Sequence, residues 1–448
     1  TDGTKSEPAA VLFAIKNGHE LNMRLSTIDC KFELKERIRN VPHNAGPPIV
    51  ADLEGDGTME IIVCSDNDEI ICMEAPRLQE KRPRVRWRMK GLGMAKDAAT
   101  KQDGVLVSDL DGDGVKEAVF SQETADGQAS IIAVEPNGQI KWRHVFKGFD
   151  GSKPVWNLGG ITYWVAGNFT TMKHQDLYVT IRRNKMHSDV GFLLSGLNGN
   201  VLWERDRIEI PNGNLVWDIR GHGGDRIAGA DMDQDGIDEI VCAYPDRVFI
   251  VNGKKGEPTV IKNTINSLFP EEIAYYAVPV VADFNGDRKP EILYGRSGYL
   301  TALLDSGCKL IWKRDYNAAG TNGCNFLQGA GDWDGDGEIE IGGFYKSLAG
   351  EGYEFRFYKG LSGDLLAAFP LGTAAPCTDV VTADLDRDGS DEFLFSQGIS
   401  IICMGNKGIK WSVDTGFTPG DIALADSDAD GNLEIIVCTL DGYLKVYN

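Results

Sequence analysis

An acidic motif that recurs along the chain limits what this sequence can fold into more than any other feature. It reads Asp-x-[Asp/Glu/Asn]-x-Asp-[Gly/Arg]-x-x-Glu, and an apolar segment follows each copy. Its seven copies begin at Asp52, Asp109, Asp231, Asp283, Asp332, Asp384 and Asp426. The 122 residues between Asp109 and Asp231 are roughly double the other intervals, and a degraded copy with Asn168 and Thr170 in place of carboxylates lies between them. The sequence therefore predicts eight repeats.

Each repeat has the pattern of four short strands. An apolar segment leads into the acidic loop, a second follows it, a third comes after a Gly/Asn/Asp turn, and a fourth carries a tryptophan in five repeats. These tryptophans are Trp87, Trp142, Trp203, Trp312 and Trp411. Four-stranded units of about 50 residues without helical periodicity are typical of β-propeller blades. The fold class that we predict is all-β, as an eight-bladed β-propeller.

The two ends of the chain predict how the ring closes. The last repeat stops at Asn448 without a fourth strand, whereas Cys30–Arg37 resembles the fourth strand at Cys308–Arg314. We expect the N-terminal segment, about residues 1–40, to complete blade 8, which would remove two open sheet edges. Although 448 residues would ordinarily indicate two or three domains, the repeats predict a single propeller domain over residues 1–448.

The acidic loops present hard oxygen ligands at alternate positions of a tight turn. Three or four such side chains, with a glutamate eight residues after the first aspartate, match the six to eight oxygens that Ca²⁺ prefers. Without a cation, carboxylates crowded in this way repel one another. The predicted metal ligands are Asp52, Glu54, Asp56, Glu60, Asp109, Asp111, Asp113, Glu117, Asp231, Asp233, Asp235, Glu239, Asp283, Asn285, Asp287, Glu291, Asp332, Asp334, Asp336, Glu340, Asp384, Asp386, Asp388, Glu392, Asp426, Asp428, Asp430 and Glu434.

This loop pattern resembles the calcium loops of integrin-like (FG-GAP) propellers. The resemblance implies about seven structural Ca²⁺ sites, one in each complete loop, on a single face of the ring. The degraded loop at Asn168 is expected to hold no metal. Such open loops suit millimolar calcium, which predicts a secreted, periplasmic or cell-surface location. The functional site is then expected on the opposite face of the ring.

Composition argues against several classes of protein. The net charge of −21 argues against nucleic-acid binding, which needs a basic face. The longest nearly apolar segment, Ala274–Ala282, is too short to span a bilayer. Among the nine cysteines, Cys64, Cys242 and Cys438 lie in apolar segments and are expected to be buried thiols, with a Cys64–Cys72 disulfide as the alternative. We expect a monomer.

The loops predicted on the opposite face gather basic and aromatic residues. In blades 3 and 4 these segments are Arg182–His187 and Trp217–His222, although the chain as a whole is acidic. Cations suit an anionic ligand, and aromatic side chains offer stacking surfaces for sugar rings. The predicted substrate-binding residues are His43, Lys96, Trp156, Arg182, Arg183, Lys185, Trp217 and Asn322. The alternative interpretation is that these segments are solvated turns.

Eight blades with Asp-x-Asp-x-Asp-Gly loops also look like the propeller of the family 11 polysaccharide lyases, which are secreted rhamnogalacturonan lyases. The resemblance implies β-elimination in a polysaccharide that contains rhamnose and uronic acid. Such a lyase neutralises the C6 carboxylate, removes the C5 proton and protonates the leaving C4 oxygen. The candidates for these three roles are, in order, Arg220 (or Arg182, or one further Ca²⁺), His187 or His222, and Tyr275 or Tyr276.

Other functions stay open at this point. A non-catalytic, integrin-like propeller would bind carbohydrate or protein without turnover. A glycoside hydrolase such as a rhamnosidase would need two carboxylates, for which Asp97, Asp218 and Asp225 are candidates. A quinone-dependent dehydrogenase would carry Gly-Lys-x-x-Trp signatures in place of acidic loops. Only elimination leaves a conjugated C4=C5 double bond, so product absorbance separates a lyase from a hydrolase. For the lyase, the binding propeller and the hydrolase, the expected partner is an acidic polysaccharide or oligosaccharide. For the binding propeller, a protein surface is the alternative partner.

Overall fold

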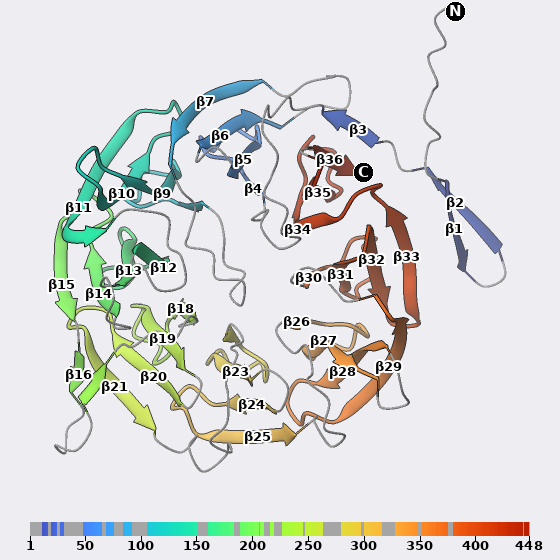
Figure 1. The fold of residues 1–448 in the computed structure, drawn as a ribbon. Coiled ribbons are helices and arrows are strands. Elements are labelled where there is room, and N and C mark those ends of the chain that lie inside the picture. The colour runs from blue at the N-terminus through green and yellow to red at the C-terminus, as the bar shows by residue number, and fades with distance from the viewer. Residues whose placement is uncertain are drawn as a thin grey trace, which may run out of the picture.

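The computed structural model of the chain is a closed ring of β-sheets (Figure 1). Every regular element that it describes is a strand, and the described residues contain no helix that could cross a bilayer. The residues described are 11–16, 19–24, 27–30, 48–64, 69–75, 84–91, 105–150, 160–182, 189–205, 207–209, 216–218, 226–244, 247–262, 279–296, 300–315, 328–347, 352–374, 380–441 and 443–447.

Eight four-stranded antiparallel sheets form the ring, which confirms the predicted eight-bladed propeller. Blade 1 consists of β4 (Ile49–Ala51), β5 (Glu60–Cys64), β6 (Glu69–Glu74) and β7 (Val85–Lys90). Blade 2 consists of β8 (Leu106–Ser108), β9 (Glu117–Glu123), β10 (Gln128–Val134) and β11 (Ile140–Asp150). Blade 3 consists of β12 (Gly160–Gly167), β13 (Asp176–Arg182), β14 (Asp189–Leu194) and β15 (Val201–Arg205). Blade 4 consists of β18 (Arg226–Ala230), β19 (Glu239–Tyr244), β20 (Arg247–Asn252) and β21 (Glu257–Lys262).

The remaining four blades repeat this order. Blade 5 consists of β22 (Val280–Ala282), β23 (Glu291–Arg296), β24 (Leu300–Leu304) and β25 (Leu310–Asp315). Blade 6 consists of β26 (Gln328–Gly331), β27 (Glu340–Lys346), β28 (Tyr353–Lys359) and β29 (Leu365–Gly372). Blade 7 consists of β30 (Val381–Ala383), β31 (Glu392–Gln397), β32 (Ser400–Gly405) and β33 (Gly408–Asp414). Blade 8 consists of β34 (Pro419–Ala425), β35 (Glu434–Thr439), β36 (Leu444–Tyr447) and, from the N-terminal region, β3 (Thr27–Cys30).

The ring closes through the two ends of the chain, as the sequence predicted. β3 pairs with β36, with Thr27 opposite Tyr447 and Cys30 opposite Leu444. The pairing strand is Thr27–Cys30, directly before most of the segment predicted for it, and residues 31–37 lie outside the described residues. In the centre of the ring β34 lies beside β4, so that blade 8 meets blade 1 (Figure 1).

The hydrophobic core is divided into eight clusters, each shared by two consecutive blades. The second and third strands of a blade, such as β31 and β32, are buried along almost their whole length because a neighbouring blade covers each face. The cluster that joins blade 8 to blade 1 contains Ile436 and Val446 together with Ile61 and Ile71. No blade buries its faces alone, so the folded unit is the complete ring.

Two hairpins lie outside this pattern. β1 (Val11–Lys16) pairs with β2 (His19–Arg24), and β1 lies beside β33 of blade 7 rather than joining blade 8. Within the predicted segment 1–40, only β3 therefore contributes a strand to a blade among the residues described. β16 (Arg207–Glu209) pairs with β17 (Val216–Asp218), and β16 is seen at the periphery of the ring (Figure 1).

The cysteines follow the sequence expectation in part. Cys72, Cys242, Cys308 and Cys403 are buried, and Cys64 and Cys72 do not form a disulfide. Cys64 is exposed, which corrects the expectation that it is buried, because it stands at the end of β5 where the strand leaves the core. Burial raises the pKa of the Cys72 thiol to about 12, so this sulfur behaves as a small apolar group.

Candidate functional site

Each acidic loop connects the first and second strands of its blade and is organised by its first aspartate. In blade 1, Asp52 Oδ1 accepts hydrogen bonds from the backbone N–H groups of Gly55 and Asp56 at 2.7 and 3.1 Å. Its Oδ2 accepts one from Gly57 at 2.8 Å. The fourth and sixth positions need a positive φ, which glycine adopts without strain. Where blade 4 has Gln234 at the fourth position, that residue still takes a φ of 65°.

The glutamate at the ninth position bonds the backbone of the second residue of its loop. In blade 1, Glu60 Oε2 accepts a hydrogen bond from the backbone N–H of Leu53 at 3.1 Å, and Glu239 Oε2 accepts the equivalent bond from Met232 at 3.0 Å in blade 4. All seven of these glutamates are buried. A buried carboxylate that uses only one oxygen in this bond still has a second oxygen, Oε1, available within the acidic loop.

Several of these loops bring carboxylate oxygens close enough for one metal ion. In blade 6, ligand atoms of Asp332, Asp334, Asp336 and Glu340 lie within 4.8 Å of one another. Three carboxylates meet in the same way in four further loops, which are Asp109, Asp111 and Glu117; Asp231, Asp233 and Glu239; Asp384, Asp386 and Glu392; and Asp426, Asp428 and Glu434. This donor set is all hard oxygen, which fits Ca²⁺.

The pKa values of the buried glutamates are raised where negative charges crowd together. Burial, together with repulsion from the neighbouring aspartates, raises the pKa of Glu239 to about 7 and that of Glu340 to about 7. A carboxylate with such neighbours is stabilised in its charged form by a bound cation. The loops therefore have the chemistry of cation sites rather than of simple turns.

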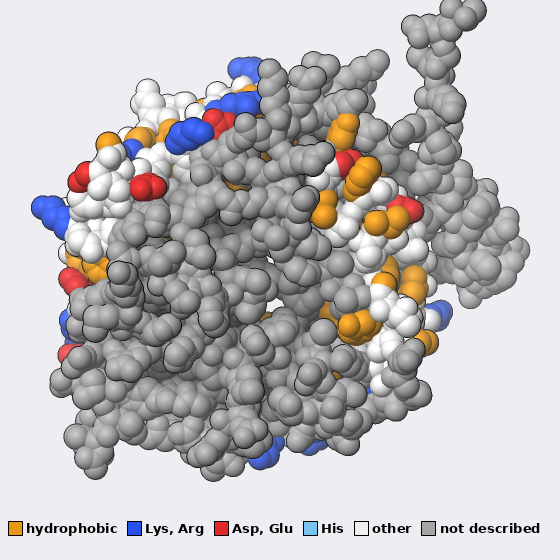
Figure 2. Space-filling view, viewed as in Figure 1, with side chains coloured by type: hydrophobic (Ala, Val, Ile, Leu, Met, Phe, Trp, Pro, Cys, Tyr) orange, Lys and Arg blue, Asp and Glu red, His pale blue; other side chains and the backbone are white. Residues whose placement is uncertain are grey.

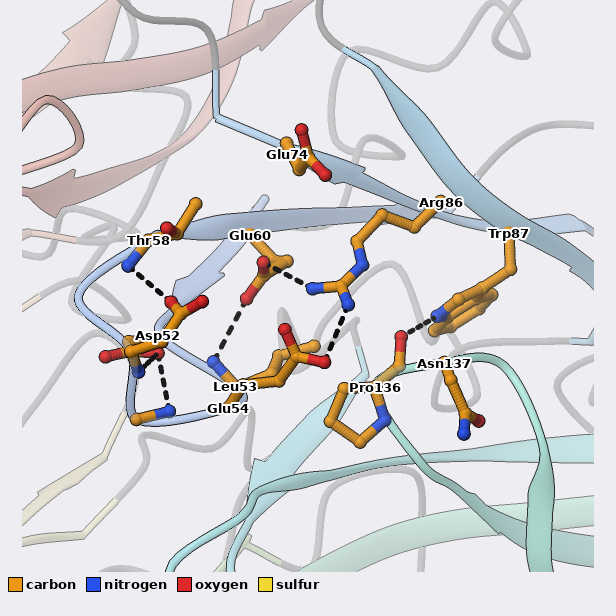
Figure 3. A network of polar contacts seen from close by, with 12 residues as sticks. Asp52, Leu53, Glu54, Thr58, Glu60, Glu74, Arg86, Trp87, Pro136 and Asn137 are labelled. Carbon is orange, nitrogen blue, oxygen red and sulfur yellow. Dashed lines mark hydrogen bonds and ion pairs between the residues drawn. The ribbon is translucent and has the colours of Figure 1, made fainter.

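In blade 1 the second oxygen of the glutamate is already occupied by the protein itself. Arg86 Nη1 lies 2.6 Å from Glu60 Oε1, and Arg86 Nη2 lies 2.8 Å from Glu54 Oε1 (Figure 3). The guanidinium thus stands between two of the four predicted ligands. These hydrogen bonds raise the pKa of Arg86, so it stays charged.

Lysines take the same place in blades 2 and 7. Lys141 Nζ lies 2.7 Å from Glu117 Oε1 and 2.6 Å from Asp111 Oδ2. Lys410 Nζ lies 2.7 Å from both Glu392 Oε1 and Asp386 Oδ2. We did not predict these three cations from the sequence, although each is visible there as a basic residue directly before a tryptophan of the fourth strand.

In the degraded loop of blade 3, neutral donors and a histidine take the place that arginine or lysine has in blades 1, 2 and 7. Asp176, at the ninth position, is fully buried and accepts a hydrogen bond from Thr170 Oγ1. His174 Nε2 lies 3.3 Å from Asp176 Oδ1. Asn168 uses its side-chain amide to bond the carbonyl oxygen of Thr171. Both oxygens of Asp176 are therefore engaged by protein groups.

The tryptophans of the outer strands link consecutive blades, a role that sequence reasoning missed. Trp87 donates its indole N–H to the carbonyl oxygen of Pro136 in blade 2 at 3.0 Å (Figure 3). Trp142, Trp203 and Trp312 make the corresponding bonds to Gly196, Gly253 and Gly360 of the next blade. A glycine with positive φ lies against each ring, for example Gly199 under Trp142. Part of this signal was available in the sequence, where Gly138 and Gly199 each stand four residues before a tryptophan.

The predicted catalytic and substrate-binding residues lie outside the described residues. This applies to His43, Lys96, Trp156, Arg183, Lys185, His187, Arg220, His222, Tyr275, Tyr276 and Asn322. For Arg182 and Trp217 only the backbone is described, at the end of β13 and in the middle of β17. These assignments remain predictions.

The strands that border the basic segments can be placed. In blade 3 the acidic-loop end of the hairpin is Gly167 opposite Asp176, and the other end is Gly160 opposite Arg182. β18 begins at Arg226 and lies beside β12. Arg182, Asp189 and Arg226 therefore lie at strand ends on the edge of the ring opposite the acidic loops. Residues 183–188 and 219–225 lie outside the described residues. Figure 2 shows further basic side chains at the rim of the molecule over β7.

Comparison with known proteins agrees with the fold. A model of the FG-GAP-like repeat family matches residues 231–294, which include the acidic loops of blades 4 and 5. No curated protein matches the sequence. The chain is similar over most of its length to solved propeller structures, all at low sequence identity.

Several of these structures are rhamnogalacturonan lyases. The exotype rhamnogalacturonan lyase YesX is 16% identical with a TM-score of 0.57, over 99% of this chain and 81% of that one. The rhamnogalacturonan lyase PL11 of Bacillus licheniformis is 16% identical with a TM-score of 0.54, over 97% of this chain and 78% of that one. The quinohemoprotein alcohol dehydrogenase of Comamonas testosteroni has the same TM-score as YesX, 0.57, at a lower identity of 11%, over 92% of this chain and 74% of that one. At these identities the likeness establishes a shared propeller fold.

Proposed function

We propose that this protein is a secreted or periplasmic polysaccharide lyase that cleaves an acidic, rhamnose-containing polysaccharide by β-elimination. The observation that carries the proposal is the combination of two features in one ring: acidic loops suited to Ca²⁺, and propeller similarity to rhamnogalacturonan lyases over nearly the whole chain. The dehydrogenase is similar in fold, but the lyase class is favoured because the repeats contain Asp-rich loops and not the Gly-Lys-x-x-Trp signatures of a quinone-dependent dehydrogenase.

The proposed chemistry assigns one role to each kind of side chain in the basic segments. A cation, Arg220 or Arg182, offsets the charge of the C6 carboxylate and so lowers the pKa of the C5 proton. His187 or His222 removes that proton, the C4–O bond breaks, and a C4=C5 double bond forms. Tyr275 or Tyr276 protonates the departing oxygen. A further Ca²⁺ at the substrate would supply the same charge neutralisation as arginine.

The acidic loops have a structural role in this proposal. Ca²⁺ bound at a loop joins the first and second strands of a blade and offsets repulsion among its carboxylates. The ions lie at the edge opposite the proposed substrate site, so their removal is expected to reduce stability before it affects chemistry. This separates a structural ion from an ion that contacts the substrate.

The proposal is tested by product analysis on rhamnogalacturonan, ulvan, gum arabic and alginate. A lyase releases chains with an ultraviolet-absorbing double bond, a hydrolase releases reducing ends without it, and a binding propeller releases neither. His187→Ala and His222→Ala should lower turnover, by roughly 100-fold or more for the residue that acts as the base. His174→Gln, on the acidic-loop edge, is the matched control and should retain activity. Reducing ends without absorbance would overturn the proposal.

A further inference from the structure

The oxygen Oε1 of the ninth glutamate has a different partner in different blades. It is 2.6 Å from Arg86 in blade 1 and 2.7 Å from Lys141 and Lys410 in blades 2 and 7. In each case the same basic group also contacts the residue at the third position of the loop. A cation of the protein thus occupies the centre of three acidic loops.

The position of that cation is set by a bulge in the outer strand. Cys72 pairs with Trp87 and Met73 with Val85, so Arg86 is the extra residue of the bulge. Lys141 and Lys410 are the extra residues at the equivalent bulges of blades 2 and 7. In blades 3 to 6 the same bulges contain uncharged residues, which are Leu202, Thr259, Ile311 and Leu366. In blades 1 to 7 the bulge residue is therefore basic only where the acidic loop has a cation of its own. In blade 8, β3 pairs with β36 without a bulge, so no residue takes this place among those described.

In blades 4 and 8 the equivalent oxygen is buried and has no partner. Glu239 Oε1 and Glu434 Oε1 accept no hydrogen bond from the part of the chain that the structure describes, and each side chain is only 2% exposed. A buried anionic oxygen without a donor is costly, and here it faces other carboxylates. This is the environment that a bound cation would satisfy.

Blades 5 and 6 also lack a basic side chain at the bulge. In blade 6 four carboxylates gather, while the nearby Lys359 pairs with the half-buried Glu338, which is not one of them. In blade 5, Asn285 Nδ2 donates to Glu291 Oε1 at 2.7 Å. Rotation of this amide by half a turn would present its oxygen to an ion in the same loop.

We propose that the acidic loops are of two kinds: those of blades 4, 5, 6 and 8 bind one Ca²⁺ each, whereas those of blades 1, 2 and 7 are neutralised by Arg86, Lys141 and Lys410 instead. This inference rests on the calcium binding proposed above and is independent of the lyase activity. Ca²⁺ can enter the second kind of loop only by displacing a cation that already bonds two of its ligands, and the displaced charge stays close enough to repel the ion.

The ions are counted by equilibrium dialysis of the chelator-treated, full-length protein against rising Ca²⁺, with bound calcium measured by atomic emission. We expect a class of four sites to saturate first. Seven equivalent sites would overturn the two kinds of loop while leaving calcium binding intact. The absence of bound calcium would overturn the proposed calcium sites themselves, and this inference with them.

Substitution of the bulge residue tests whether its charge determines which loops bind calcium. Lys141→Leu, which introduces the residue found in blades 3 and 6, should add a fifth site to the first class. Arg143→Leu removes the same charge from the same strand, but Arg143 bonds the side chain of Gln122 and should leave four. Leu366→Lys, at a side chain that is 43% exposed and tolerant of change, should reduce the class to three. If folded Leu366→Lys keeps four sites, or folded Lys141→Leu gains none, the inference is wrong.

Discussion

The indole N–H of Trp142 donates a hydrogen bond of 2.7 Å to the carbonyl oxygen of Gly196, across the boundary between blades 2 and 3. Trp142 is also buried in the cluster that the two blades share. The outer rim of the ring is therefore held by specific polar contacts in addition to the apolar clusters nearer its centre.

Trp142→Phe keeps most of the packing and removes the N–H donor. The buried carbonyl of Gly196 would then lack its partner, and we expect a loss of about 1–2 kcal/mol in the free energy of unfolding. Urea denaturation followed by circular dichroism measures this. Trp411→Phe is the comparison, because Trp411 is partly exposed, and water can replace a lost partner there. An equal loss at both positions would contradict a specific role for the Trp142 bond.

Gly199→Ala tests the close approach of the same ring. Gly199 has a φ of +70°, and a Cβ there would lie 2.6 Å from Trp142 Cε3. Strain in the left-handed region costs about 1–2 kcal/mol, and the clash should add about 1–3 kcal/mol. Gly148→Ala in β11 has a φ of +83° with nothing within 4 Å of the added Cβ, so it should show the strain alone. The difference between the two melting temperatures isolates the contact.

Removal of calcium should destabilise the ring. An ion at 100 times its dissociation constant stabilises the folded state by about 2.7 kcal/mol per site. We therefore expect the chelator to lower the melting temperature, and added Ca²⁺ but not added Na⁺ to restore it. A melting curve that does not change with chelator would contradict structural calcium in the loops.

The ion-free protein should lose stability as the pH rises. The pKa of Glu239 is raised in the fold to about 7 from its ordinary value of 4.5. Between these two values the unfolded chain ionises this carboxyl while the folded chain keeps its proton, so folding becomes less favourable with each step in pH. Glu239→Gln should flatten this part of the profile. Denaturation in chelator between pH 4.5 and pH 7 tests it, and a stability that rises over this interval without change in Glu239→Gln would contradict the assignment.

Much of the fold could be predicted from the sequence because each blade repeats the same local pattern. The spacing of the Asp-rich motifs located even the blade in which Asn168 and Thr170 replace carboxylates. Ring closure was predictable because the last repeat lacks a strand, although the strand itself, Thr27–Cys30, lies slightly earlier than the predicted segment. Register across a blade decides such details, and it depends on pairing that a local pattern does not contain.

The metal sites were only partly predictable. Counting carboxylates gave seven similar loops, but Arg86, Lys141 and Lys410 come from another strand, 26, 24 and 18 residues after the glutamates that they bond. These basic side chains meet the loop because each is the extra residue of a bulge directly before a tryptophan. The position of a bulge depends on strand pairing, which the local sequence does not contain. The proposed catalytic residues lie in segments outside the described part of the chain, and their roles are predictions from the sequence.

The most direct test of the account is the ultraviolet absorbance of a rhamnogalacturonan solution incubated with the calcium-loaded wild-type protein. The account predicts a steady rise, because each elimination creates one conjugated double bond. A folded, calcium-loaded protein that gives no rise on rhamnogalacturonan, ulvan, gum arabic or alginate would contradict it.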